Sequence, residues 1–426
     1  MNFNTILYRL GIDPSNFINR YIEPIKTEYG FIYDVEQRKD IRICPACKSK
    51  NAIINDYYYV EINCSETDHI KDTLRIKKVR FKCKECHKTY TMPINGIEKY
   101  SKISIQTKNM IIKDFAKIIS FKSIADRYNL TRQRILQLFD ENVPFIPRKY
   151  MPSVLCIDEI RFKGEYNQNY CCILYDFNQR HIVDIIKNRQ LAYLEEYFQD
   201  IKESERNNVK YFISDMYDAY RTVKYKYFSS SLHIVDLFHV ISQLTRAVNK
   251  IRVTVMNRLD KDTIEYKFMK SYWRLFLCRK EKLPNGFYED KKTLNRYHYD
   301  DMLFKCLLKD NCLLESYNAL QDLYHYNQKW NFKEAFDFVN YIADRLIILN
   351  NQLLIDVGNT YRKWSVEIAN GLARNQYGKH YTNGVAESIN NHLKTIIKVS
   401  YGYHNFERFR KRAMVISSYK KELTIR

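Results

Sequence analysis

The stretch VLCIDEI (residues 154–160) is short, rich in apolar and β-branched residues, and carries two acids near its end. Such a run predicts a buried strand. Similar runs follow at NYCCILYDF (169–177), HIVDIIK (181–187), VKYFISD (209–215) and LHIVDLF (232–238). LAYLEEYFQDI (191–201) and FHVISQLTRAVNKI (238–251) carry helical periodicity instead. The segment from 154 to about 259 therefore predicts three strands, followed by helices that alternate with two further strands.

This order of elements indicates a mixed sheet with helices against it, the layered plan of the ribonuclease H fold. Asp158 follows the run VLCI, and Asp215 follows VKYFIS. In a ribonuclease H sheet the first and fourth strands are neighbours, so we expect these two carboxylates to meet despite 57 residues of separation. A third acid, Glu387, lies in the predicted helix of TNGVAESINNHLKTIIK, about 200° around the helix from Val385 and away from its apolar stripe.

Three carboxylates supply the hard oxygen ligands that Mg²⁺ or Mn²⁺ prefers. Two such ions would activate the attacking oxygen and stabilise the leaving oxygen of a phosphodiester. Each acid could also be a surface or capping residue, and other acids compete for the role. The competing acids are Glu159, Asp176, Asp184, Asp218, Asp236 and Glu367. Asp236 is the strongest competitor, and with His239 we expect it to line the site behind the metal ligands.

Two CxxC pairs predict a metal site nearer the start of the chain. Cys44 and Cys47 form one pair, Cys83 and Cys86 form the other, and 35 residues lie between them. Each pair puts two thiolates on a tight turn, which suits one tetrahedral, structural Zn²⁺ in a zinc ribbon. Free structural thiols are the alternative reading. Substitute ligands without paired spacing are Cys64, His69 and His87.

The segment FKSIADRYNLTRQRILQLFD (121–140) fits two short helices joined by a turn. Ala125 is small where the helices would cross, Asn129 tolerates a left-handed turn, and Ile135 faces inward. Thr131 is a candidate N-cap, so the first turns of the second helix would reach base edges in the major groove. The candidate DNA-reading residues are Thr131, Arg132, Gln133, Arg134 and Gln137. An ordinary helical hairpin with solvated arginines is the alternative.

The composition favours a polyanionic partner. Lys and Arg total 70 against 49 Asp and Glu, a net charge of +21, and such a surplus attracts DNA phosphates. Codons of an AT-rich genome could account for part of the lysine excess. The chain lacks a run of about 18 apolar residues and the features of a signal peptide, so we expect no membrane partner and a cytoplasmic, nucleoid-associated protein.

We therefore expect a multidomain α/β protein in which a helical insertion interrupts the ribonuclease H-like domain. Pro144, Pro147 and Pro152 mark a linker, because proline fits neither a helix interior nor a central strand. The expected domains are an N-terminal segment with the zinc ribbon (1–98), a helix-turn-helix (99–142), the linker (143–153), the first part of the catalytic core (154–259), the helical insertion (260–379) and the rest of the core with the Glu387 helix (380–426).

Together the motifs resemble the bacterial insertion-sequence DDE transposases of the ISL-three group over nearly the whole chain. The resemblance is carried by CPAC, RFKCKEC, IDEIRFK, YCCILYDFNQRHIVDII, ISDMYDAY, IVDLFHV and NGVAESINNHLKTIIKVSYGYHNFERFR. It implies that Asp158, Asp215 and Glu387 form the catalytic triad and that the substrates are the element's terminal inverted repeats and a target duplex. It also implies a homodimer or higher multimer on DNA. Asn129 departs from the glycine that is commoner in this turn.

The expected function is metal-dependent cleavage and strand transfer of DNA. Two other functions stay open. A DNA-binding regulator would use the zinc ribbon and the helix-turn-helix without any chemistry in the C-terminal domain. A structure-selective nuclease would cut DNA strands without joining them.

Overall fold

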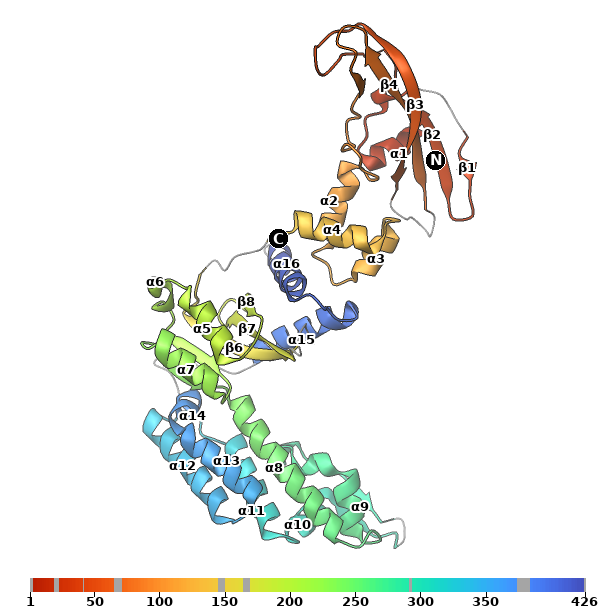
Figure 1. The fold of residues 1–426 in the computed structure, drawn as a ribbon. Helices are drawn as coiled ribbons and strands as arrows, with labels where there is room; N and C mark the ends of the chain where they lie inside the picture. Colours follow the sequence, from red (N-terminus) through yellow and green to blue (C-terminus); the bar gives the residue numbers. More distant parts are fainter. Residues whose placement is uncertain are drawn as a thin grey trace. The chain divides into compact units, whose positions relative to one another are not determined.

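A computed structural model gives the fold of the chain (Figure 1). It describes residues 3–18, 23–40, 42–64, 71–144, 150–163, 169–290, 293–373 and 384–424, with side chains for all of these except 3, 384–387 and 419–424. The chain forms two compact units. Unit 1 comprises Met1–Pro147, Lys163–Asn167 and His392–Arg426, and unit 2 comprises Arg148–Phe162 and Gln168–Asn391.

Unit 1 begins with a five-stranded sheet. Its strands are β1 (Ile25–Lys26), β2 (Phe31–Glu36), β3 (Ala52–Asn63), β4 (Thr73–Cys83) and β5 (Thr89–Thr91). Their order is β1-β2-β4-β3, with β5 also paired to β4. β2 and β4 run parallel, and the other pairs are antiparallel. Helix α1 (Phe3–Leu10), followed by the short 3-10 helix η1 (Pro14–Asn16), covers an apolar core beneath β2 and β4.

Three short helices follow this sheet, and each begins at a hydroxyl side chain. They are α2 (Ile105–Asp114), α3 (Phe121–Arg127) and α4 (Arg132–Asn142). The hydroxyls of Ser104, Ser120 and Thr131 accept hydrogen bonds from backbone N–H groups in the first turns of α2, α3 and α4, respectively. Such caps satisfy N–H groups that a helix start otherwise leaves without partners, so the sequence fixes where each helix begins.

The C-terminal helix α16 (Phe406–Thr424) packs on these three helices. Arg412 is only 1% exposed, and its Nη2 donates to the carbonyls of Lys117 and Ile119, both at 3.0 Å. Its guanidinium lies 4.8 Å from the ring centroid of Phe121. The sequence led us to expect 380–426 with the catalytic core, whereas 392–426 lies in unit 1. The final helix thus completes the interior of the α2–α4 group.

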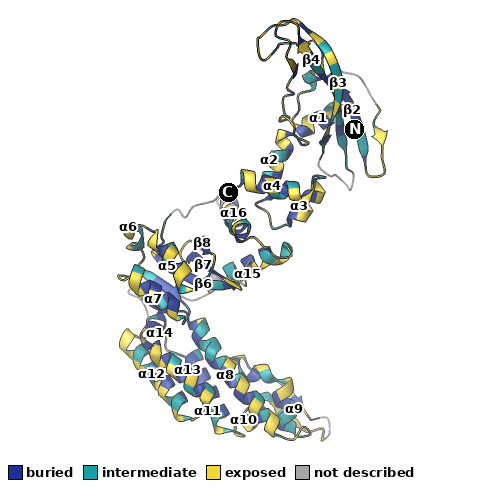
Figure 2. Ribbon diagram, in the orientation of Figure 1, coloured by how far each residue is buried: buried dark blue, intermediate teal, exposed yellow. Residues whose placement is uncertain are grey.

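Unit 2 is built on a second five-stranded sheet, of mixed direction. Its strands are β6 (Val154–Arg161), β7 (Tyr170–Asp176), β8 (His181–Ile186), β9 (Tyr211–Ser214) and β10 (Leu232–Val235). The order is β10-β9-β6-β7-β8. β6, β7 and β8 are antiparallel neighbours, while β9 runs parallel to both β6 and β10. Buried residues run along β6, β7 and β8 (Figure 2).

Helices accompany this sheet. Those between the strands are α5 (Leu191–Gln199), α6 (Glu203–Arg206) and α7 (Asp218–Tyr227). The long α8 (Leu237–Arg258) leads into a helical group (Figure 1). Buried apolar side chains of α8 and of this group form a core of their own. That group contains α9 (Ile264–Ser271), η2 (Trp273–Phe276), η3 (Lys280–Lys282), β11 (Phe287–Glu289), β12 (Arg296–His298), α10 (Tyr299–Leu307), α11 (Asn311–Tyr324), α12 (Phe332–Ile348), α13 (Gln352–Lys363) and α14 (Ser365–Leu372).

Helix α14 returns to the edge of the sheet. Gly371 lies so close to β10 that a Cβ atom there would stand 2.6 Å from the carbonyl oxygen of Val235. Asn370 donates to the carbonyl of His233 at 2.8 Å. Helix α15 (Gly384–Val399) follows, and the boundary between the two units falls within it.

The strands and helices predicted between 154 and 259 are confirmed, and so is the broader prediction of a mixed α/β protein with more than one compact unit. The five predicted strands are β6 to β10, and the two predicted helices are α5 and α8. In the parts of the chain that the structure describes, no helix has both the length and the apolar character to cross a bilayer.

Candidate functional sites

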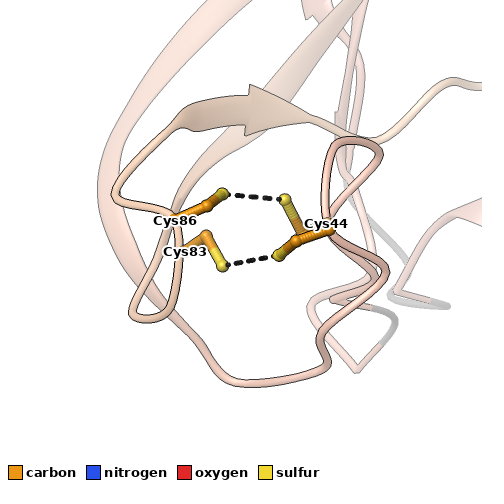
Figure 3. Close-up of side chains that lie close together, drawn as sticks. Cys44, Cys83 and Cys86 are labelled. Carbon is orange, nitrogen blue, oxygen red and sulfur yellow. Dashed lines mark hydrogen bonds between the residues drawn. The ribbon is translucent and has the colours of Figure 1, made fainter.

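The four cysteines of the two CxxC pairs come together in unit 1 (Figure 3). Sγ of Cys44 lies 3.6 Å from Sγ of Cys86, and Sγ of Cys47 lies 3.5 Å from Sγ of Cys83. All four sulfur atoms lie within 4.8 Å of one another, so they could hold one metal ion. A closed set of four thiolates suits a structural ion, because no position is left for a substrate.

The two turns that carry these cysteines are alike. Lys48 N–H donates to the Cys44 carbonyl at 2.9 Å, and His87 N–H donates to the Cys83 carbonyl at 3.1 Å. Lys48 and His87 both have left-handed backbones, with φ of 61° and 58°. A hydrogen bond from the Cys47 N–H lowers the pKa of Cys44 to about 6, and one from the Cys86 N–H lowers the pKa of Cys83. The backbone of each turn therefore favours a thiolate at the first cysteine of its pair.

The substitute ligands do not join this group. Cys64 is buried in the core under α1, where burial raises the pKa of its thiol to about 12. His87 ends the second turn and its side chain is exposed. His69 lies outside the described residues. Among the described residues, the candidate metal ligands are therefore the four cysteines of the two CxxC pairs.

The two-helix segment has the local geometry that its sequence predicts. Thr131 caps α4, and its hydroxyl accepts from the Arg134 N–H at 3.2 Å. Asn129 has φ of 51°, the left-handed conformation expected at the turn. Ala125 and Ile135 are buried. The side chains expected to read DNA lie on the outer surface of α4, with Arg132, Gln133 and Gln137 exposed and Arg134 half-buried.

Three aspartates lie in one row across unit 2. β6 pairs with β9 up to Cys156 opposite Ile213, and β9 pairs with β10 up to Val235 opposite Ser214. Continuing both registers puts Asp158, Asp215 and Asp236 level with one another, beyond the last residues that pair β6 with β9 and β9 with β10. Neighbouring strands lie about 4.8 Å apart, and level residues on parallel strands face the same side. Register thus brings together two of the three predicted triad acids and the strongest competitor.

Asp158 lies inside β6, and two hydrogen bonds orient its carboxylate. Oδ1 accepts from the Glu159 N–H, and Oδ2 accepts from Asn390 Nδ2, both at 2.7 Å. Asn390 belongs to α15, one helical turn after Glu387. The side chain of Glu387 lies outside the described residues. Sequence reasoning missed Asn390, although its spacing from Glu387 was the available signal.

Asp215 is the most electrostatically perturbed of these acids. Burial, followed by the charges of Glu159 and Asp158, raises its pKa to about 7, and the nearby Arg189 only partly offsets this. Its Oδ1 is buried and has no hydrogen-bond partner among the described residues. Clustered, desolvated carboxylates are stabilised by a cation. The donor set at Asp158 and Asp215 therefore fits a hard divalent ion.

The described acids alone do not complete such a site. Among described side chains, the four cysteines are the one group of three or more ligands close enough to share an ion. A site with three carboxylate ligands thus needs a carboxylate from a residue whose side chain is not among those described. Glu387 is the predicted source.

Most of the competing acids have other partners. Asp176 accepts from the Tyr150 hydroxyl and from the N–H groups of a turn, and Asp184 accepts from the Tyr197 hydroxyl. Asp218 pairs with Lys363 at 2.7 Å. Glu367 forms a bidentate pair with Arg221 at 2.7 and 2.9 Å. Glu159 stays near the row, where it pairs with Arg189.

Asp236 and His239 lie at the start of α8. Asp236 caps this helix by accepting from the Phe238 N–H at 3.0 Å, and its Oδ2 lies 3.7 Å from His239 Nε2. Burial lowers the pKa of His239, while the charges of Asp158 and Glu159 act in the opposite direction. The imidazole therefore lies within electrostatic reach of the acidic row.

A buried polar network supports Asp215 from behind. The Ser214 hydroxyl donates to the Asp215 carbonyl at 2.8 Å and lies 2.9 Å from His233 Nε2. The hydroxyl has one proton, so Nε2 is the donor toward Ser214. Burial lowers the pKa of His233 to about 3, which keeps the ring neutral. Ser214 is only 2% exposed and cannot act as a nucleophile toward a substrate.

Comparison with known proteins identifies the family. A family profile described as Transposase matches residues 155–413, which is more than half of the chain. The class of protein is therefore that of the DDE transposases. Within this class the chain belongs to the ISL-three group.

A curated protein of a different name also resembles part of the chain. It is called ATP-dependent protease, comes from Lactococcus lactis subsp. lactis, and is 26% identical over 143 residues. The match covers 33% of this chain and 41% of that protein, so the chain spans about two fifths of the relative's length.

Proposed function

We propose that the chain binds the terminal inverted repeats of an insertion sequence and catalyses metal-dependent cleavage and strand transfer of DNA. The observation that carries this proposal is the alignment of Asp158 in β6 with Asp215 and Asp236, which directly follow the neighbouring parallel strands β9 and β10. Membership in a transposase family supports it. The sheet order β10-β9-β6-β7-β8 supports a ribonuclease H-like core, with β6, β7 and β8 antiparallel and β9 parallel to both β6 and β10.

In this proposal Asp158, Asp215 and Glu387 would hold Mg²⁺ or Mn²⁺. Such ions, when bound, would supply activation of the attacking oxygen and stabilisation of the leaving oxygen in an in-line displacement. Asn390 and the Glu159 N–H orient the Asp158 carboxylate. Water as nucleophile nicks the strand, and the freed 3′-hydroxyl as nucleophile joins strands, so one set of carboxylates serves both steps.

Further residues shape the site without holding the ions. Asp236 and His239 line it behind the ligands, and their position at the start of α8, in register with Asp215, supports this role. Arg189 pairs with Glu159 and lies close enough to offset part of the rise in the pKa of Asp215. The Ser214–His233 pair fixes the backbone that presents Asp215.

The DNA-binding part of the proposal lies in unit 1. Zn²⁺ held by Cys44, Cys47, Cys83 and Cys86 stabilises the ribbon, and α3 and α4 act as a helix-turn-helix. The bases are read by Thr131, Arg132, Gln133, Arg134 and Gln137. The net charge of +21 supports binding to duplex DNA. A homodimer or higher multimer would hold the two element ends together.

The test compares wild-type protein with Asp158→Asn on a duplex carrying the DNA that flanks the chain's own gene. With Mg²⁺, the wild type should nick or join strands. The variant should lose at least about 100-fold in rate, because several kcal/mol of charge stabilisation depend on the ligand. Both proteins should bind the duplex equally.

Asp218→Asn is the matched control, because Asp218 pairs with Lys363 on the surface. This variant should cleave like the wild type. Equal activity of Asp158→Asn and wild type would remove Asp158 from the mechanism. Tight binding without cleavage by the wild type, in Mg²⁺ and in Mn²⁺, would favour the DNA-binding regulator instead.

A further inference from the structure

Among the described residues, the two most exposed large apolar or aromatic side chains are tyrosines that lie on either side of α4. Tyr401 is 94% exposed and Tyr100 is 90% exposed. Both have left-handed backbones, with φ of 55° and 64°, a conformation that bulky residues rarely adopt. Tyr100 precedes α2, whereas Tyr401 lies in the turn between α15 and α16. Both belong to unit 1.

Each tyrosine borders a hollow along one side of α4. Tyr100 lines a hollow of about 480 Å³ together with Lys102, Thr131 and Arg134. Tyr401 lines a second hollow of about 440 Å³, whose other members include Lys122, Arg132, Leu136 and His404. On a helix, Arg134 lies about 200° around from Arg132. The two hollows therefore flank the exposed face that carries Gln133 and Gln137.

Hydrogen bonds hold the segment that carries Tyr100 against the turn between α3 and α4. Asn63 N–H donates to the carbonyl of Lys102 at 2.8 Å, and its side chain donates to the carbonyl of Asn129 at 2.6 Å. Asn129 lies in the turn between α3 and α4. The backbone next to Tyr100 is thus fixed with respect to α4.

The turn that carries Tyr401 is held in place by the contacts of the following helix, α16, with α3 and α4. Arg408 pairs with Asp140 of α4 at 2.6 Å, and the ring centroid of Tyr403 lies 6.3 Å from that of Phe121. Buried Arg412 joins α16 to the carbonyls that precede α3. Both tyrosines are therefore presented by backbone that is already positioned, which lowers the entropy cost of binding.

We propose that Tyr100 and Tyr401 are DNA clamps that hold the two sugar-phosphate strands on either side of α4. A helix in the major groove, which is about 12 Å wide, has a phosphate backbone on each flank. Tyrosine hydroxyls and lysines bind phosphates without regard to sequence. Lys99 and Lys102 accompany Tyr100, and Lys122 and His404 accompany Tyr401. This inference rests on the proposed DNA binding by α4, and it adds a C-terminal turn to that surface.

The test measures binding of the full chain to two labelled 30-base-pair duplexes, by fluorescence anisotropy over a range of salt concentrations. One duplex carries the DNA that flanks the gene, and the other has random sequence. Tyr100→Ala and Tyr401→Ala should each weaken binding to both duplexes about 3- to 10-fold. Lys102→Ala and Lys122→Ala should each reduce the slope of log affinity against log salt by about 0.9.

Tyr341→Ala is the matched control, because Tyr341 is 56% exposed on α12 in unit 2. It should bind like the wild type. Tyr100→Phe and Tyr401→Phe keep the ring and remove the hydroxyl, so they should lose most of the same affinity. Thermal unfolding should be unchanged in every tyrosine variant, since these side chains are exposed.

Two outcomes would overturn the clamps. If Arg132→Ala weakens binding while the tyrosine and lysine variants bind like the wild type, this inference fails and the proposed function stands. If the wild type binds neither duplex, the DNA-binding part of the proposed function fails as well.

Discussion

Asp114 is a single buried carboxylate that ties α2 to α3. It is 3% exposed and accepts hydrogen bonds from Arg127 at 2.7 Å and from the Tyr128 hydroxyl at 3.0 Å. Lys117 pairs with its other oxygen at 2.6 Å. Burial acts to raise the pKa of Asp114, but these partners outweigh it and lower the pKa below its ordinary value.

We predict that Asp114→Asn destabilises unit 1 by about 1–3 kcal/mol at pH 7, because the variant leaves charged donors poorly satisfied. A carboxyl with a lowered pKa in the folded state contributes stability above its unfolded pKa of about 3.9. That contribution is lost as the pH falls through the folded pKa. Thermal unfolding at pH 7 and at pH 3 should therefore show a gap between wild type and variant that shrinks at pH 3.

Asp126→Asn is the control on the neighbouring helix, since Asp126 is half-exposed and pairs with the exposed Lys122. Its effect should stay below about 1 kcal/mol. A gap for Asp114→Asn that is equally large at both pH values would argue against a role for its charge.

At the scale of elements, α16 is the clearest case of a distant segment that completes a core. Phe409 and Ala413 of α16 are fully buried. On the helices that α16 covers, the rings of Phe115, Phe121 and Phe139 pack edge to face. Without α16 this aromatic cluster would face water.

We predict that truncation after residue 405 destabilises α2, α3 and α4, even though these helices end more than 260 residues earlier. The loss should be on the order of several kcal/mol, given the number of apolar side chains exposed. Hydrogen exchange should show faster exchange of amides in α2–α4, with those of β6–β8 unchanged. A truncation after Ser418 keeps Phe409 and Arg412, so its α2–α4 amides should stay protected. Unchanged exchange after the longer truncation would contradict this role of α16.

At the scale of the whole molecule, the two units depend on different interactions. Unit 1 joins small apolar clusters to the cysteine group, whereas unit 2 contains the large apolar core of α8–α14 and the core of the second sheet. Small cores of this kind gain much of their stability from a bound structural ion.

We predict that a zinc-selective chelator lowers the unfolding temperature of unit 1 and leaves that of unit 2 unchanged. Differential scanning calorimetry should then show two transitions, of which only one moves. Cys47→Ser should reproduce the shift without chelator, because it removes one of the four thiolates. Cys278→Ser, a change in unit 2 outside the cluster, should not. Two transitions that respond equally to the chelator would contradict a metal confined to unit 1.

Part of this organisation could be predicted from the sequence because it depends on neighbours along the chain. Thr131 caps α4, Asn129 turns left-handed and the CxxC pairs form matching turns through contacts that span only a few residues. Apolar periodicity likewise predicted β6 to β10, since a half-buried or buried strand has a recognisable local pattern.

Only the tertiary structure decided which distant groups meet. The register of β6, β9 and β10 aligns Asp236 with Asp158 and Asp215, and a shift of one residue would have turned its side chain to the other face. Asp218 and Glu367 were also candidates by sequence, but they form ion pairs with Lys363 and Arg221, respectively. The packing of α16 on α2–α4 could not be predicted from the sequence either. Packing between remote segments depends on complementary shape and buried area, which no local sequence pattern indicates.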